Sequence, residues 1–432
     1  MGVWSEVRRT DLLNSHRFDS DYFKPEYIKL ENQLLMLKGR KLKYDAVLIK
    51  CGPFGSTIKN ETYKQYGVIV ARPFNINNLE FEYENIAFIS EDDFKRKNLI
   101  SCQDKDIFFS RVGDVKVGIL NNKQNIKITI SPNIVLLRLN NNNIKPEYAT
   151  VFFNTSYGIK QILRAQKVVA QPTISTSLLN NLFVFDPGID IQIEISEQFN
   201  EAMKLRQISK SLYTQAKQLL EKELGLDKLI LEKPKSYETS YSEIMSHHRM
   251  DADYFQTHFK IQDEHLKNLN IESLGKIVNF MKGIEVGSHN YTDSGKLYIR
   301  VSNVKENGII AGNSDKYISD ELYNSLREFK PDIGDILLTK DGTIGECYVI
   351  DRDIEGIISG GIMKMTLKDS CIPAEYLCLV INSRICKFQI DRVCSGALIL
   401  HWKPKDIANL KIPILDEYSA PICQDRFFCG LS

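Results

Sequence analysis

The amino-acid sequence predicts an α+β fold in which two homologous domains are joined by a long amphipathic, coiled-coil helix. Three observations predict it: an order of segments that occurs twice, mixed helix and strand patterns within each occurrence, and one uninterrupted helical stretch between them. The composition fits this fold, because 43% hydrophobic and 26% charged residues in a chain of 432 residues are usual for a soluble protein of more than one domain.

The duplication is seen in short segments that recur in the same order. HRFDSDYF (16–23) recurs as HRMDADYF (248–255), and GVIVARPFNI (67–76) recurs as GKLYIRVSNV (295–304). DIFFSRVG and PEY, which follow in the first copy, recur as DILLTKDG and AEY in the second. Several matches in one order indicate a repeated domain.

Each copy mixes helical periodicity with short β-rich runs, which favours α+β over alternating βαβ units. The elements expected in the two copies are helices at 24–37, 146–166, 175–181, 256–269, 373–392 and 404–409, and strands such as 67–71, 106–110 and 134–139.

The stretch between the copies predicts one long helix, whose apolar residues advance by three or four positions. These residues are Ile195, Phe199, Ala202, Leu205, Ile208, Leu212, Ala216 and Leu219. No Pro or Gly interrupts the stretch before Gly225, which stands where a helix stop is expected. A stripe of this kind pairs with another helix.

The expected domains are 1–189, the spacer helix 190–230, a linker at 231–236, the second domain at 237–415 and a divergent tail at 416–432. The tail reads DEYSAPICQDRFFCGLS, with Pro421 and no heptad pattern. The second helix that the duplication predicts after the second copy is therefore missing or truncated.

Charge and apolar runs restrict the protein class. A net charge of +1 gives no global field that would attract nucleic acid, so DNA binding would depend on local patches. No apolar run approaches the roughly 18 residues of a membrane span, and the first residues lack a signal core, which predicts a cytoplasmic protein with no membrane partner.

Catalytic and metal-site motifs are missing, so we expect no catalytic residue and no metal ligand. The sequence has no G-x-S-x-G, H-E-x-x-H, Walker loop or [DNS]-P-P-[YF] segment. One alternative is a Mg²⁺-dependent nuclease that uses Asp106, Asp114 and Lys116. The second copy keeps Asp335 but has Thr343-Ile344-Gly345 in place of D-x-K, so a strand and hairpin explain the segment better.

Basic and amide side chains on predicted loops are the candidate DNA-binding residues, since Arg and Lys bind phosphates or guanine and Asn pairs with adenine. They are Lys59, Arg72, Arg111 and Lys116 in the first copy, and Lys282, His289, Asn290, Arg300, Lys305 and Lys340 in the second. Arg111 and Lys340 each follow a buried strand and precede a glycine, and Arg72 and Arg300 also hold equivalent positions.

The chain resembles the specificity (S) subunit of type I restriction–modification systems. The residues that carry the resemblance are HRFDSDYF, HRMDADYF, GPFGSTIK, DIFFSRVGDVKVGI, ISPNIVLLRL, AQPTISTSLLNNL and the helix after Pro187. The resemblance implies two target-recognition domains, each reading one half of a bipartite target in double-stranded DNA. It implies no cofactor in this chain.

The resemblance also implies partners that carry the chemistry. Two methyltransferase (modification) subunits would hold S-adenosylmethionine and methylate adenine N6, and a motor–nuclease (restriction) subunit would cut. The spacer helix would set the separation of the two domains and dock the methyltransferases through Phe199, Leu205, Leu212 and Leu219. Alternatives are the specificity subunit of a related type II system, the nuclease above, and a protein-interaction scaffold that does not bind DNA.

Overall fold

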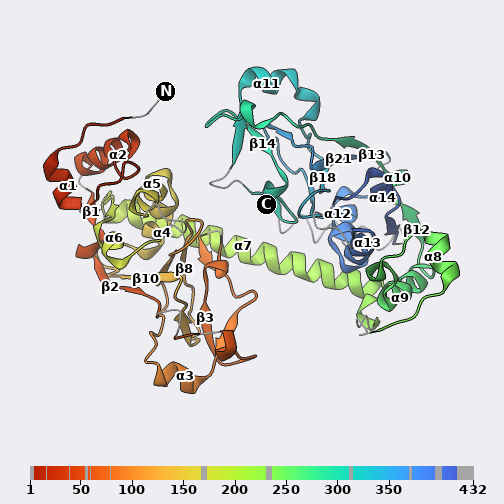
Figure 1. Ribbon diagram of the computed structural model, residues 1–432, viewed down its shortest axis with the longest axis horizontal. Helices are drawn as coiled ribbons and strands as arrows, with labels where there is room; N and C mark the ends of the chain where they lie inside the picture. Colours follow the sequence, from red (N-terminus) through yellow and green to blue (C-terminus); the bar gives the residue numbers. More distant parts are fainter. Residues whose placement is uncertain are drawn as a thin grey trace. The chain divides into compact units, whose positions relative to one another are not determined.

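The computed structural model describes residues 4–15, 17–37, 39–53, 57–58, 60–77, 79–166, 173–229, 236–310, 315–368, 372–394 and 401–415. The chain divides into two compact units, Met1–Lys204 and Leu205–Ser432, which are coloured red to green and green to blue in Figure 1. The predicted tail at 416–432, and all of the predicted linker except Ser236, lie outside the described residues.

The first unit is built on a six-stranded sheet with the order β2-β10-β7-β8-β5-β4. These strands are β2 (Ala46–Cys51), β10 (Ile134–Leu139), β7 (Ile107–Ser110), β8 (Val117–Ile119), β5 (Glu80–Phe81) and β4 (Ile76–Asn77). Beside it lies a sheet of β6 (Ala87–Ile89), β3 (Val68–Ala71) and β9 (Ile128–Ile130), and β1 (Arg40–Lys41) pairs with β11 (Phe183–Val184). β3 runs antiparallel to β6 and parallel to β9.

The second unit repeats this pairing. Its sheets have the orders β13-β21-β18-β19 and β17-β14-β20, and β14 runs antiparallel to β17 and parallel to β20. The strands are β13 (Val278–Lys282), β21 (Ile362–Leu367), β18 (Ile336–Thr339), β19 (Cys347–Val349), β17 (Lys316–Ile318), β14 (Lys296–Ile299), β20 (Gly356–Ile358), β12 (Ile271–Ser273), β15 (Val304–Lys305), β16 (Gly308–Ile309) and β22 (Lys411–Pro413). A shared pairing pattern is what a duplicated sequence produces.

Helices pack on these sheets in each unit. The first unit has α1 (Arg9–Ser15), α2 (Pro25–Met36), α3 (Glu91–Arg96), α4 (Pro146–Asn154), α5 (Ser156–Ala165) and α6 (Thr176–Asn181). The second has α8 (Tyr241–His247), α9 (Thr257–Leu266), α10 (Leu274–Ile277), α11 (Asp320–Ser325), α12 (Ala374–Asn382), α13 (Arg384–Cys394) and α14 (Pro404–Ala408). The α+β class predicted from the sequence is confirmed. Among the described residues, no helix combines the length and the apolar character that crossing a membrane requires.

The single helices predicted at 146–166 and 373–392 are wrong, because each is two helices. Thr155 leaves the helical region, with φ −74° and ψ 166°, and its hydroxyl accepts a hydrogen bond from the Gly158 N–H that starts α5. Ser383 also leaves the helical region between α12 and α13, with φ −77° and ψ 165°, and its hydroxyl donates to the Val380 carbonyl at 2.6 Å. A Cβ on Gly158 would lie 2.3 Å from the Phe153 Cα, so only glycine lets α5 fold back this closely.

The repeated HR-x-D-x-D-YF segment forms the same cage in both units. Arg17 binds Asp19 through two hydrogen bonds of 2.6 and 2.8 Å, and Tyr22 lies between the guanidinium groups of Arg17 and Arg164, at 4.8 and 4.3 Å. In the second unit Tyr254 lies between Arg249 and Arg392, at 4.5 and 4.4 Å. Cation–π contact and ion pairing therefore fix the start of each unit against α5 or α13.

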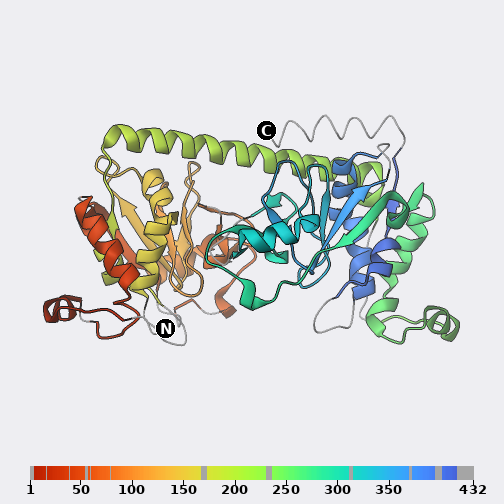
Figure 2. The same ribbon diagram turned by 90° about the horizontal axis from the view of Figure 1, so that it is seen from above.

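The long helix α7 (Ile189–Glu223) is continuous through its 35 residues, as Figure 2 shows. At about 1.5 Å per residue it is roughly 50 Å long. It ends before Gly225, which adopts the left-handed conformation with φ 68°, as the sequence predicts. The division between the two compact units falls within this helix.

The apolar stripe that the sequence predicts on α7 is divided between two faces of the helix: part of it packs into the cores of the two units and part remains outside them. Ile195, Phe199 and Met203 pack into the core of the first unit, and Ala216 and Leu220 into that of the second. Phe199 is only 7% exposed, so its prediction as a partner-binding residue is wrong. The reason is the 100° step per residue, which turns Phe199 inward while Leu205, Ile208, Leu212 and Leu219 lie on another face.

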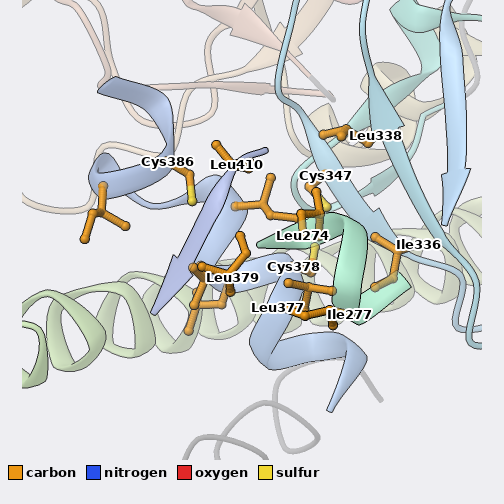
Figure 3. Close-up of a cluster of buried hydrophobic side chains, with 14 of the residues drawn as sticks. Leu274, Ile277, Ile336, Leu338, Cys347, Leu377, Cys378, Leu379, Cys386 and Leu410 are labelled. Carbon is orange, nitrogen blue, oxygen red and sulfur yellow. The ribbon is translucent and has the colours of Figure 1, made fainter. Parts of the chain in front are cut away.

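The core of the second unit contains buried free cysteines. Cys347, Cys378 and Cys386 are buried among Leu274, Leu338 and other side chains in Figure 3. Burial raises the pKa of the Cys347 and Cys386 thiols, which keeps them protonated and unreactive.

A buried ion pair holds the centre of the first unit. Asp106 is fully buried and accepts two hydrogen bonds of 2.7 Å from Arg138, whose strand β10 lies next to β7. In the second unit the equivalent Asp335 accepts a hydrogen bond from Thr366 at 2.7 Å and lies 3.6 Å from Lys364.

Removing Asp106 should destabilise the first unit, because Arg138 would keep a largely buried charge without the carboxylate that balances it. We expect Asp106→Ala to lower the local stability by about 3 kcal/mol, or roughly 100-fold in exchange rate. Hydrogen–deuterium exchange of peptides covering β7 and β10 measures this change. Asp114→Ala is the matched control, with a change below about 0.5 kcal/mol, because this exposed carboxylate lies four residues past the end of β7 and shows no ion pair among the described residues. Equal protection in both variants would contradict a stabilising role for the pair.

Candidate nucleic-acid interface

In each unit, the candidate site lies around one turn to which the ends of several strands are hydrogen-bonded. Residues 131–133 connect β9 to β10, and residues 359–361 connect β20 to β21; we call these the junction turns. In the first unit Ser131 N–H donates to the Ala71 carbonyl at 2.8 Å, and Arg111 N–H donates to the Asn133 carbonyl at 2.8 Å. The ends of β3 and β7, and with them Arg72 and Arg111, therefore meet at the junction turn.

The second unit has the same backbone arrangement. Ser359 N–H donates to the Ile299 carbonyl at 2.8 Å, and Lys340 N–H donates to the Gly361 carbonyl at 2.9 Å. Arg300 and Lys340 therefore flank the second junction turn as Arg72 and Arg111 flank the first. The structure thus brings together the residue pairs that the sequence predicted at equivalent positions.

Glycine is required where β2 and β13 end, because these strands also approach the junction turns. A Cβ on Gly52 would lie 1.9 Å from the Ser131 carbonyl oxygen, and a Cβ on Gly283 would lie 2.2 Å from that of Ser359. Exposed Lys282, the last residue of β13, precedes Gly283 and is held near the same turn.

A cleft of about 680 Å³ opens beside the first junction turn. Its lining residues are Ile58, Tyr63, Arg72, Pro73, Phe74, Asn85, Ser131, Pro132 and Asn133. Aromatic side chains next to cations are typical of surfaces that bind nucleic acid, where bases stack and phosphates are neutralised.

Arg72, which lines this cleft, and Arg111, which follows β7 at the same junction turn, keep unused hydrogen-bond donors. Arg72 donates one hydrogen bond to the Asn85 carbonyl, and Arg111 donates one to the Pro132 carbonyl at 3.3 Å. Neither Nε atom has a partner in the described part of the chain, although both are buried. Neither arginine shows an ion pair with a carboxylate there, so their positive charge remains available to an anion.

Lys116 lies near the same cleft. Its ammonium group is 3.4 Å from Asn77 Oδ1, and Asn77 also donates to the Phe74 carbonyl at 3.2 Å. The Phe74 ring is 59% exposed, which the sequence did not single out. Lys59, the remaining candidate of the first copy, lies outside the described residues.

Lys340 differs from its counterpart Arg111. It is 7% exposed and its ammonium group lies 2.6 Å from Asp341 Oδ2, while Asp341 Oδ1 lies 2.8 Å from His401 Nδ1. Burial tends to raise the pKa of Asp341, but the hydrogen bonds from His401 and Lys340 outweigh it and hold this pKa below its usual value. Lys340, predicted as a DNA-binding residue, is therefore buried, and the adjacent Asp341 carboxylate balances its charge.

The remaining candidates of the second copy are spread over other loops. His289 and Asn290 belong to the short helix η6 (Ser288–Asn290), where the Asn290 amide donates to the Val286 carbonyl at 2.6 Å. Lys305 lies in the β15–β16 hairpin, next to Glu306, which pairs with Lys217 of α7 at 2.9 Å. The structure does not bring Lys305 to the junction turn by any contact that it shows.

The residues of the nuclease alternative are kept apart. Asp106 is buried against Arg138 before β7 begins, whereas Asp114 and Lys116 follow its other end. A strand of four residues separates them by more than about 10 Å, too far for two carboxylates to share one metal ion. Within the described ranges, no group of three acidic, His or Cys side chains could hold a metal ion.

Two residues of the second site, Asp341 and His401, were not predicted from the sequence. Asp341 stands directly after Lys340, but an acid next to a candidate phosphate ligand reads as unfavourable for DNA binding. His401 lies 60 residues further along the chain, and an isolated β-bridge brings it beside Asp341. No local pattern in the sequence predicts this pairing.

Comparison with known proteins gives similar solved structures only. No protein-family model matches the chain, and no curated protein matches it. The S subunit of a type I restriction–modification system from M. genitalium is similar over 91% of this chain and 88% of its own, with 12% identity and a TM-score of 0.40. The HsdS subunit from Thermoanaerobacter tengcongensis is similar over 91% and 88%, with 11% identity and a TM-score of 0.28. The type IIG restriction endonuclease BpuSI is similar over 45% of this chain and 30% of its own, with 10% identity and a TM-score of 0.32.

Proposed function

We propose that this chain is the DNA-recognition subunit of a type I restriction–modification complex. Each unit reads one half of a bipartite target in double-stranded DNA through the loops around its junction turn. The observation that carries the proposal is the duplicated site: cations follow equivalent strands in both units and meet at equivalent turns. Two copies of one reading surface, with different side chains, suit a target with two different halves.

Methylation and cleavage belong to partner subunits in this proposal. Two methyltransferase subunits bind S-adenosylmethionine and modify adenine N6, and a motor–nuclease subunit cuts DNA. The duplicated sites support a chain whose role is binding, since their side chains are guanidinium, ammonium, amide and aromatic groups that make contacts to phosphates and base edges. The place of work is the cytoplasm, where DNA and these partners meet.

The exposed face of α7 is the proposed docking site for the methyltransferases. Leu205 and Ile208 are 49% and 43% exposed, and Leu212 and Leu219 are partly exposed on the same face. Their spacing of three, four and seven residues is that of a coiled-coil seam. None of the four belongs to the hydrophobic clusters of either unit within the described residues.

The two-reader proposal predicts separate defects for equivalent arginines. Arg72→Ala should change the preference for bases in one half of the target, and Arg300→Ala in the other half. A lost contact to a base edge reduces binding by about 1–3 kcal/mol at its own position, whereas a lost phosphate contact weakens all sequences alike. Selection of duplexes from a randomised pool by each full-length variant measures both effects.

Lys127→Ala is a suitable control, since Lys127 is exposed, pairs with Glu91 of α3, and precedes β9, whose other end leads into the junction turn. This variant should select the same sequences as the unmodified chain. If Arg72→Ala and Arg300→Ala altered the same half of the target, the model of two readers would be refuted.

The docking proposal predicts loss of partner binding when the seam of α7 becomes charged. Leu205→Asp with Ile208→Asp should abolish co-purification with the methyltransferase subunits, because burying two carboxylates in an apolar interface is unfavourable. Gln207→Asp, exposed on another face of the same helix turn, should leave co-purification intact. Retained binding by the double variant would place the interface elsewhere.

The spacer role of α7 predicts a change in target geometry. Four helical residues inserted after Lys210 would lengthen the helix by ~6 Å and keep its faces nearly in phase. The preferred gap between the half-sites should widen by roughly one or two base pairs, at about 3.4 Å each, with unchanged half-site sequences. The same insertion after exposed Asn141 is the control. An unchanged gap would show that the helix does not set the separation.

A further inference from the structure

The two units have the same backbone hydrogen bonds beside their junction turns, but the side chains at these positions differ in charge and polarity. In the first unit Val112 forms a β-bridge with Thr173, and Ile174 N–H donates to the Arg111 carbonyl at 3.0 Å. In the second unit Asp341 forms a β-bridge with His401, and Trp402 N–H donates to the Lys340 carbonyl at 2.9 Å. An apolar side chain and a hydroxyl in the first unit thus correspond to a carboxylate and an imidazole in the second.

The carboxylate of Asp341 is held in place and remains partly exposed. Lys340 and His401 each bind one of its oxygens, at 2.6 and 2.8 Å, and its side chain is 28% exposed. A carboxylate oxygen has two acceptor positions, so each oxygen keeps one. Gly361 of the junction turn leaves this carboxylate uncovered, whereas a Cβ at that position would contact Oδ2 at 3.6 Å.

The neighbours of Asp341 reduce the electrostatic repulsion that its carboxylate would exert on DNA phosphates. An isolated carboxylate would repel the phosphates, but the ammonium of Lys340 balances this charge and the imidazole donates a second hydrogen bond. What remains is a rigid acceptor at the position that Val112 holds in the first unit, next to the residue where that unit presents Arg111 and its unused donor. An acceptor in the major groove fits the amino groups of cytosine and adenine, whereas an arginine fits guanine O6 and N7.

We propose that Asp341 is a specificity-determining residue that accepts a hydrogen bond from the exocyclic amino group of a cytosine or adenine in the half-site read by the second unit. This inference rests on the proposed function. It assigns different chemical readers to the two halves: a carboxylate in the second unit and guanidinium groups in the first. Lys340 and His401 are positioning residues, since they orient this carboxylate.

The test compares the full-length chain with Asp341→Asn in selection from a randomised duplex pool. Asparagine has nearly the same shape and keeps one oxygen to accept from His401, but it replaces an acceptor by an N–H donor. The unmodified chain should require an amino-bearing base, cytosine or adenine, at one position of one half-site. Asp341→Asn should shift that position towards guanine or thymine by about 10- to 100-fold and leave the other half-site unchanged.

A second measurement uses the unmodified chain, so it does not depend on a variant that folds. The selected base is replaced by its analogue without the amino group, 2-pyrimidinone for cytosine or purine for adenine, which also distinguishes the two bases. Binding should fall about 10- to 100-fold, and Asp341→Asn should no longer distinguish the analogue from the natural base. Asp114→Asn, an exposed acid of the first unit, is the matched control and should behave as the unmodified chain.

The outcomes separate the inference from the proposed function. A chain that selects no sequence would overturn both. Two results would overturn the role of Asp341 alone: selection of the same bipartite target by the unmodified chain and by Asp341→Asn, or equal binding of the analogue and the natural base by the unmodified chain. The contact between Asp341 and His401 would then serve only to stabilise the fold. A shift confined to one position of one half-site supports the role.

Discussion

Backbone hydrogen bonding at the junction turns is the constraint on which each unit depends. Strands of both sheets end at this turn, and the carbonyls of Ala71 and Ile299 accept from the turn while Arg111 and Lys340 donate to it. The peptide groups cannot be left unpaired inside a protein, so the strand ends are held there whatever side chains they carry. The side chains that follow these strands are consequently brought to one surface.

The sequence predicted the strands at this turn better than the chemistry of the site. Val68–Ala71, Ile107–Ser110 and Ile134–Leu139 are short β-branched and aromatic runs, whose pattern is local and readable. The contact between Asp341 and His401 depends on a bridge between distant segments, which no local pattern encodes. Equivalent cations could be found because the duplication aligned them, whereas the acid of the second unit had no counterpart to point to it.

For the helix α7, the sequence likewise predicts the local structure but not the tertiary contacts. Its existence and its end at Gly225 follow from periodicity and from the residue that starts the left-handed turn. Which apolar residues face inward depends on the unit that each half contacts, and Phe199 and Leu205 cannot be assigned from spacing alone. The helix division at Thr155 was missed for a related reason, because a single hydroxyl cap replaces the Pro or Gly that would have marked it.

The glycines at the junction turns have an evolutionary consequence. Gly52 and Gly283 permit no Cβ, so mutation at these positions would disturb the approach of three strands and be removed by selection. Pro132 and Asn133 correspond to Gly360 and Gly361, and Val112 corresponds to Asp341, without any change in the hydrogen bonds of the turn. After a gene duplication, the exposed side chains of one copy of such a site can change while its hydrogen-bonded backbone and its glycines stay under purifying selection. Under the proposed function, new DNA preferences can therefore arise by a few point mutations, with little risk to folding.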